Sequence, residues 1–589
     1  MKQFNSITAN IDTYLFYLFI LILPLFPYSQ TAFALFSVLL LLVVKTIKMF
    51  LTKKITFSTG VFDIPIILIA ATYIISALFI TPSKMDAFIF PGTTSIIVIG
   101  SFLYFLTNQI DLAGKRVLKY FLFSGIVLYS VMILLISTKI LPMFKPIDNY
   151  LLPTLYITSL IPIMINLFSV EKEFVYRFLI GVATVISIFA MVVAILVSPK
   201  PNLLPFNVST TIATSSLKQN LIFGIGSGNF VNAFNKFRPF DFNQSEIWSI
   251  KFNEGSSFLI TNLTEIGILG SITILALTAI YINFAINTTV TRKKVGWGIL
   301  GSVDLLSVAI ILIELALFQS APIIIFTLFI LFGLISDSKK HEYIMPNIII
   351  SGFITIPLLT LITLASLKIF SVTSAEYHYN AGLMKLSENK AKESFDSLKK
   401  SINVNSKVDR YHRAMSSIYF GIANSVSKKQ DISESEKEQV TIFIQESINE
   451  GKAAVAINNK SSENWEFLGK TYHLLIPFTK GADIFAIESY KEAIALDPIN
   501  PNLRIKLGEV YMIQKKYDDA IELFNLAILA KDDHPNAHFN LALAYKEKGE
   551  IEKAKTELDK TLELVDKEND KDYEMILKEI NSLSTVQTQ

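Results

Sequence analysis

The sequence contains no cysteine, and it has little net charge for its length. Without cysteine the chain has no disulfide framework, no thiolate metal site and no cysteine nucleophile. The formal charge is +3 over 589 residues, and the lysines are interspersed with acidic residues instead of forming a basic stripe. We therefore expect no nucleic-acid partner.

Hydrophobic residues, by contrast, make up 51% of the chain, and the mean hydropathy of +0.47 is more than a single soluble core requires. The average conceals two compositions. Up to about Phe370 the sequence consists of runs of Ile, Leu, Phe and Val, whereas beyond Ser374 it is rich in Lys, Glu, Asp and Asn with apolar residues at helical spacing. This change predicts a domain 1–373 followed by a domain 374–589.

The first domain contains about eleven apolar stretches long enough to cross a membrane. Because lipid offers no hydrogen-bond partners, a spanning segment must satisfy its own backbone, which a helix of roughly 20 apolar residues does. The predicted spans are residues 12–28, 31–47, 61–80, 94–108, 118–138, 152–170, 178–197, 258–286, 299–318, 320–336 and 346–370. We expect an all-α fold, with a polytopic membrane helix bundle followed by a soluble helical domain.

Lysine and arginine are concentrated in alternate loops between these spans. With a cytoplasmic N-terminus, the inner loops include Lys53, Lys54, Arg116, Arg177 and Arg292, and the outer short loops hold only Lys84, Lys139 and Lys145. Because positively charged short loops stay in the cytoplasm, this asymmetry predicts a cytoplasmic N-terminus. An odd number of spans then places the long loop 198–257 and the C-terminal domain outside.

The second domain repeats a pattern of small and large residues every ~34 residues. The pattern is found at Leu468, Gly469 and Tyr472, at Leu507, Gly508 and Tyr511, and at Leu541, Ala542 and Tyr545. It resembles the tetratricopeptide repeat, which stacks paired helices into an α-solenoid. Segments 375–403 and 408–457 fit loosely, and we expect degenerate repeats there. Because the concave surface of such solenoids generally binds peptides, we expect a protein partner.

The long loop 198–257 contains Gly224, Gly226 and Gly228, followed by Asn229 and Phe230. A dinucleotide site would require a βαβ unit around such glycines, and a multi-span membrane domain offers none. On its own, this segment predicts only a tight turn at a helix end. The span after the loop begins with Phe258 and Leu259 and carries Glu265, Gly267 and Gly270.

Together, the Gly-x-Gly-x-Gly-Asn-Phe segment and the later Phe-Leu-x5-Glu-x-Gly-x-x-Gly segment resemble the O-antigen ligase and polymerase family. The resemblance covers about residues 200–340 by motif and 1–370 by architecture, and several family members also carry C-terminal tetratricopeptide repeats. It implies a membrane glycosyltransferase that moves a glycan from a polyprenyl diphosphate carrier to an acceptor hydroxyl. The reaction would take place at the outer face of the bacterial cytoplasmic membrane, without a metal or another cofactor.

The sequence departs from this family at one place. Members usually carry a His-Asn pair just before the Phe-Leu step, where this chain has Gly255 and Ser256. Transfer to a hydroxyl is helped by a base, most often histidine. Three interpretations stay open. Glu254 serves as the base, since burial raises the pKa of a carboxyl toward neutrality; a histidine of the repeats folds over the loop; or the activity has been lost.

Three basic residues of the long loop are candidates for contact with the diphosphate, whose charge cannot stay unpaired beside hydrocarbon. Arg238 is the leading candidate, with Lys236 and Lys251 near it. The alternative is a solvated charge or a contact with lipid headgroups. The remaining candidates for substrate binding are Gly226, Gly228 and Asn229.

Glu265 completes the predicted catalytic set with Glu254 and Arg238, because acidic residues inside a membrane are costly and often functional. The alternative is a structural hydrogen bond between helices, which applies to Glu314 as well. Two other functions also stay open for the whole chain. One is a non-catalytic membrane scaffold whose outer repeats dock a protein, and the other is a transporter, against which the spans show no inverted repeat.

Overall fold

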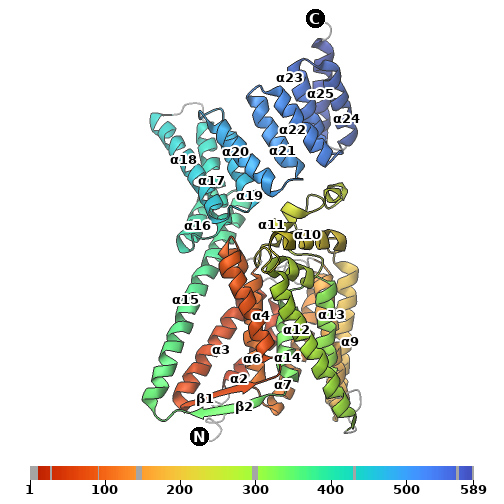
Figure 1. Cartoon of the computed structure of the whole chain (residues 1–589), viewed down its shortest axis with the longest axis vertical. Coiled ribbons are helices and arrows are strands. Elements are labelled where there is room, and N and C mark those ends of the chain that lie inside the picture. The colour runs from red at the N-terminus through yellow and green to blue at the C-terminus, as the bar shows by residue number, and fades with distance from the viewer. Residues whose placement is uncertain are drawn as a thin grey trace. The chain divides into compact units, whose positions relative to one another are not determined.

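The computed structural model describes residues 11–26, 29–89, 92–140, 149–294, 303–428, 433–565 and 570–586. The chain forms two compact units (Figure 1). The first, which we name the apolar unit, comprises Met1–Phe230 and Asn253–Thr373; the second, the repeat unit, comprises Val231–Phe252 and Ser374–Gln589. The sequence assigned the whole loop 198–257 to the first domain, whereas the segment Val231–Phe252 groups with the repeats.

Helices make up most of the apolar unit. They are α2 (Ile11–Ile22), α3 (Gln30–Thr52), α4 (Asp63–Ile75), α5 (Lys84–Phe88), α6 (Thr93–Asn108), α7 (Leu112–Ser137), α8 (Leu151–Val170), α9 (Phe174–Val197), α10 (Phe206–Gln219), α12 (Phe258–Lys294), α13 (Val303–Leu317), α14 (Pro322–Ile335) and the first part of α15 (Ile348–Ser387). Each predicted span contains a helix, although residues 27–28 and 299–302 of those spans lie outside the described residues.

Among the described residues, eight helices are long and apolar enough to cross a membrane. Two shorter apolar helices lie at Ile11–Leu25 and Pro322–Ile335. A total of about eleven spans stays a prediction, because the shorter helices do not reach the length that a bilayer requires by themselves.

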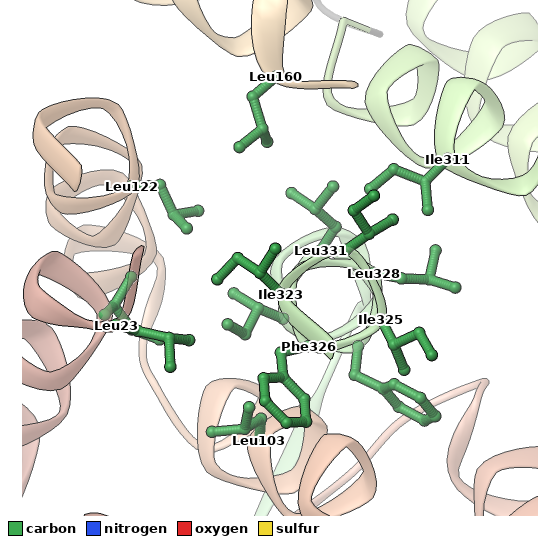
Figure 2. Close-up of a cluster of buried hydrophobic side chains, with 14 of the residues drawn as sticks. Leu23, Leu103, Leu122, Leu160, Ile311, Ile323, Ile325, Phe326, Leu328 and Leu331 are labelled. Atoms are coloured by element: carbon green, nitrogen blue, oxygen red, sulfur yellow. The ribbon is translucent and has the colours of Figure 1, made fainter. Parts of the chain in front are cut away.

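Helix α14 is the most enclosed helix of the apolar unit. Every residue from Ile323 to Leu334 is buried, as expected for a helix that is hydrophobic all round. Figure 2 shows Leu103, Leu122 and Ile311, from three neighbouring helices, pointing toward it. The core of this unit is therefore built around the predicted span 320–336.

A two-stranded antiparallel sheet is the exception to the all-α prediction. Strand β1 (Lys54–Thr59) pairs with β2 (Lys339–Ile344), with Lys54 opposite Ile344 and Thr59 opposite Lys339. Phe57 stacks on the ring of Tyr343 at 5.8 Å. The strands are short, mostly exposed and far apart in sequence, so no local hydrophobic pattern indicated them.

The repeat unit consists of the last part of α15 and the helices that follow it. These are α16 (Ala391–Val404), α17 (Asp409–Ser427), α18 (Glu434–Ile457), α19 (Ser462–Leu475), α20 (Ala482–Leu496), α21 (Pro501–Ile513), α22 (Tyr517–Ala530), α23 (Pro535–Lys548), α24 (Ile551–Leu564) and α25 (Asp570–Val586). The segment Val231–Phe252 adds most of α11 (Phe230–Phe237) and the short helix η3 (Phe240–Gln244). No turn interrupts α15 where the composition changes.

Small residues allow the paired helices of the repeats to approach closely. A Cβ on Gly469 would lie 2.9 Å from the ring of Tyr490, and one on Gly508 would lie 2.5 Å from the ring of Phe524. Helices α19, α21 and α23 each pack on the next helix in the chain, and the same is true of α17 with α18. The predicted alternation of small and large residues therefore has the predicted packing role.

Candidate functional site

The two motifs that suggested a glycan transferase pack directly on each other in the apolar unit. The backbone N–H of Ile225 donates to the carbonyl oxygen of Thr264 at 3.1 Å, and that of Gly226 donates to the carbonyl of Glu265 at 2.9 Å. In return, the N–H groups of Ile268 and Leu269 donate to the loop carbonyls at positions 221 and 222, both at 3.1 Å. The glycine-rich segment thus supplies partners for the backbone of α12.

This pairing is possible because α12 is interrupted at Gly267. Its dihedral angles, φ 64° and ψ −160°, belong to a region essentially restricted to glycine. A Cβ on Gly267 would lie 2.5 Å from the carbonyl oxygen of Ile222, and one on Gly224 would lie 2.4 Å from the carbonyl oxygen of Thr264. Both glycines are required by close backbone approach, which explains their place in the two motifs.

Gly226 and Gly228, predicted to bind substrate, have a packing role as well. Their φ angles are +100° and +72°. A Cβ on Gly226 would lie 2.6 Å from the Cα of Thr81, and one on Gly228 would lie 2.7 Å from the carbonyl oxygen of Asp86. The tight-turn interpretation accounts for both glycines, and substrate contact stays a prediction.

Glu265 lies at the centre of a buried polar cluster formed by Thr93, Thr94, Ser227, Glu265 and the N–H of Phe230. The Glu265 side chain is 1% exposed, and its carboxylate accepts hydrogen bonds from the Thr93 hydroxyl at 3.2 Å and from the Phe230 N–H at 3.3 Å. The Ser227 hydroxyl lies 2.8 Å from each threonine hydroxyl. A buried carboxylate needs such donors, so the cluster ties the glycine segment to the acidic residue of α12. The side-chain amide of Asn229, another predicted substrate contact, donates to the carbonyl of Ile225 at 2.9 Å.

Glu254 is partly buried and precedes the second motif, which begins at Phe258. Burial raises the pKa of its carboxyl to about 7, which is the range that suits a general base. Glu254 and Glu265 are close enough to interact electrostatically. Glu314, by contrast, is buried in α13, and its carboxylate oxygens find no hydrogen-bond partner among the described residues.

Gly255, at the position where the family that the motifs resemble usually carries a histidine, is tightly packed. The N–H of Gly255 donates to the hydroxyl of Thr261 at 2.9 Å, and its carbonyl accepts from the amide of Gln319 at 3.0 Å. A Cβ on Gly255 would lie 2.6 Å from the hydroxyl of Ser209, which itself accepts from the N–H of Ser256. A histidine here would require Ser209 to turn away.

The predicted diphosphate contact, Arg238, is engaged inside the repeat unit. The residue is 8% exposed, and its Nη1 lies 2.7 Å from the carboxylate of Asp497. The same nitrogen donates to the carbonyl of Asn235 at 3.0 Å, and the guanidinium lies 5.1 Å from the ring of Phe234. A diphosphate would have to compete with Asp497 for this arginine.

The two predicted lysines differ from each other. Lys251 is paired with Glu463 at 2.9 Å, and Glu463 is also paired with Arg413 at 2.9 Å. These two cations lower the pKa of Glu463 to about 2, despite its burial. Lys236 is exposed and lies over the ring of Phe237 at 5.4 Å. Its role as a diphosphate contact stays a prediction.

A histidine of the repeats does contact the loop segment. The ring of His534 lies edge-on to the indole of Trp248 at 5.6 Å, and its Nε2 lies 3.1 Å from the side-chain oxygen of Asn502. Burial lowers the pKa of His534, so that it stays neutral near pH 7. No local pattern in the sequence indicates that Trp248 and Asn243 contact the repeats. Among the described residues, no group of three or more His, Asp or Glu side chains is arranged to hold a metal ion.

Comparison with known proteins identifies the repeats. The tetratricopeptide-repeat family model matches residues 486–538 and 512–580. The C-terminal helices are therefore tetratricopeptide repeats, as predicted, and such repeats suggest protein–protein interaction. No curated protein matches the chain.

Similar solved structures include a crystal structure of MamA, which is 21% identical, with 32% of this chain and 91% of that chain covered and a TM-score of 0.27. They also include TTC0263, a tetratricopeptide-repeat protein of Thermus thermophilus, at 16% identity, with 36% and 99% covered and a TM-score of 0.27. YrrB, a repeat protein described as having an unusual peptide-binding site, is 16% identical, with 32% and 84% covered and a TM-score of 0.24.

Proposed function

We propose that this chain is a multi-pass protein of a bacterial cytoplasmic membrane, and that its apolar unit is a glycan transferase of the O-antigen ligase type. In this proposal the donor is a polyprenyl-diphosphate-linked glycan at the outer face of the membrane. The tetratricopeptide repeats lie on the same side and bind a protein. The membrane part of the proposal is supported by the eight helices of sufficient length and apolarity.

Contacts between distant loops support the proposed alternation of the spans. Strands β1 and β2 both belong to loops predicted to be inner. The hydroxyl of Thr81 donates to the carbonyl of Ser227 at 3.0 Å, and both residues belong to loops predicted to be outer. The N–H of Phe258 donates to the carbonyl of Phe318 at 3.0 Å, again between two predicted outer ends. Any miscount of one span between these loops would put contacting residues on opposite sides.

The observation that carries the transferase proposal is the joint packing of the two motifs around Glu265. Gly224 of one motif packs backbone to backbone on the interrupted helix of the other, and the N–H of Gly226 donates to the carbonyl of Glu265. The two motifs therefore form one structural feature. Beside this feature stands Glu254, whose carboxyl has a pKa of about 7. Glu254 would accept the proton of the acceptor hydroxyl. The hydroxyl oxygen then bonds to the sugar carbon, and the polyprenyl diphosphate leaves with the electrons of the broken bond.

Deletion of the gene tests this proposal. We expect loss of a surface polysaccharide and accumulation of its lipid-linked precursor. Complementation with Glu254→Gln should fail to restore the polysaccharide, whereas Glu246→Gln, an exposed acid of the same loop, should restore it. An unchanged glycan profile and an unchanged lipid-linked pool in the deletion strain would overturn the transferase.

A non-catalytic membrane scaffold is the second candidate. Two observations favour it: Gly255 occupies the place of the family histidine, and Arg238 is paired with Asp497. A scaffold predicts that Glu254→Gln and Glu265→Gln complement the deletion fully, and that both variants still bind the protein partner of the repeats. The two candidates therefore give opposite results in the same complementation.

A further inference from the structure

The repeats carry a regular row of charged residues along one edge. Glu463, Asp497 and Lys531 lie at equivalent positions of successive repeats, each 34 residues after the one before. They stand at or next to the connections before α19, α21 and α23. All three contact one segment, Val231–Phe252, which belongs to the same compact unit.

Two of the three contacts join opposite charges. Glu463 pairs with Lys251 at 2.9 Å, and Asp497 pairs with Arg238 at 2.7 Å. The third position carries the opposite charge: Lys531 donates to the carbonyl oxygen of Asn243 at 3.1 Å, and its ammonium lies 5.1 Å from the ring of Trp248. The sign of each repeat position therefore suits the group that the segment presents to it.

Asn243 contacts two repeats at once. Its side chain is fully buried, and its amide donates to the carbonyls of Ile499 at 2.7 Å and of Ala530 at 3.1 Å. These carbonyls belong to two successive repeats. Because an unpaired carbonyl is costly when buried, one asparagine here satisfies the ends of two repeats at once. This one side chain therefore joins the segment to two successive repeats.

The segment Val231–Phe252 also has a small aromatic core of its own. Phe234, Phe242 and Phe252 pack on one another, with ring centroids 5.4 to 6.3 Å apart, and all three are buried. This small aromatic core fixes the turn through η3 that presents Asn243. A preorganised ligand loses less conformational entropy on binding.

We propose that the edge formed by Glu463, Asp497 and Lys531 is a peptide-binding site whose resident ligand is the chain's own segment Val231–Phe252. The protein partner of these repeats is thus, in the first instance, the external loop of the same chain. A separate protein would have to displace the segment in order to bind this edge. It would need the same chemical groups, namely two cations, one on either side of a buried asparagine. The assignment depends on the repeats being a binding module and does not depend on the transferase activity.

The packing between the segment Val231–Phe252 and the repeats is incomplete. A cavity of about 150 Å³ lies between the segment and the repeats, lined among others by Arg238, Trp248, Asp497 and Asn502. Two buried atoms on its walls, Nε of Arg238 and Oδ1 of Asn235, have no hydrogen-bond partner among the described residues. A polar cavity of this size has room for water that would bridge such groups, and interfaces with bridging water are common.

Cross-linking of the full-length protein in membranes tests the assignment, since the chain has no native cysteine. The double variant Lys251→Cys with Glu463→Cys should form an intramolecular link with a short bismaleimide, and neither single variant should. Adding Arg238→Asp should lower the yield at least several-fold, and adding Asp497→Arg to that variant should restore it. Asp241→Lys, a charge reversal at an exposed position of the same segment, should leave the yield unchanged.

A synthetic peptide of residues 231–252 provides a second measurement. It should compete with the resident segment and lower the cross-linking yield, whereas a scrambled peptide should not. Absence of the link in the double-cysteine protein, or a yield that ignores both Arg238→Asp and the peptide, would overturn the proposal. Either result leaves the glycan phenotype of the deletion strain untouched, so the two proposals fail separately.

Discussion

At the scale of single residues, the carboxyl of Glu254 determines the expected pH dependence. Its pKa is raised to about 7 by burial, so the deprotonated form that accepts a proton becomes populated as pH rises through 7. We expect transfer by membranes containing the wild-type protein to fall about tenfold per pH unit below that value and to level off above it. Rates measured on both sides of this pKa, from mildly acidic to mildly basic pH, check this. If the transfer rate of Glu254→Gln falls below pH 7 in the same way, another group is responsible for the pH dependence.

The ion pair between Arg238 and Asp497 should contribute to the stability of the repeat unit. Both side chains are almost fully buried, at 6% and 1% exposure. Asp497→Ala leaves a buried guanidinium unpaired and should lower the free energy of unfolding of the repeat unit by about 3–5 kcal/mol. Thermal unfolding of the full-length protein in detergent measures the loss. Glu434→Ala, which removes an exposed pair with Lys437, is the matched control and should change stability by less than about 1 kcal/mol.

At the scale of elements, the break in α12 is the feature on which the candidate site depends. Gly267→Ala introduces a Cβ 2.5 Å from a carbonyl oxygen at backbone angles that only glycine adopts readily. We expect it to destabilise the apolar unit by at least about 1–3 kcal/mol, with a matching loss of folded protein in the membrane. Gly352→Ala on α15 meets its nearest atom at 3.6 Å and should be tolerated. Equal behaviour of the two variants would contradict the tight packing of the motifs.

Elements were predictable where the signal is local. Helix α14 follows from an apolar run alone, and the pairing of Gly508 with Phe524 follows from the repeat period. The pairing of β1 with β2 and the capture of Arg238 by Asp497 could not be predicted in the same way. Each joins residues that are hundreds of positions apart in sequence, and neither partner carries a pattern that names the other. The role of Gly226 was ambiguous for a related reason, because positive φ and ligand contact both favour glycine.

For the molecule as a whole, the proposed function depends on the side of the membrane on which each loop would lie. In the proposed membrane arrangement, the pairing of β1 with β2 and the packing of the segment 81–87 on the glycine-rich segment require these loops to share a side in pairs. They do not say which side is the cytoplasm. Only the distribution of Lys and Arg assigns that, through the positive charge retained inside. The proposed reaction requires the glycine segment and the repeats to be outside, so orientation is the assumption common to the whole mechanism.

Single cysteines in the cysteine-free chain measure the orientation directly. Glu563→Cys lies on exposed α24 of the repeats, and Lys340→Cys lies on exposed β2. We expect a membrane-impermeant maleimide to label Glu563→Cys in intact spheroplasts and to label Lys340→Cys only after the membrane is permeabilised. One predicted span, 346–370, separates the two positions, so they should be labelled from opposite sides of the membrane. Labelling of both sites from outside would contradict the span count, and the reverse pattern would place Glu254 in the cytoplasm, where a lipid-linked glycan on the outer leaflet is out of its reach.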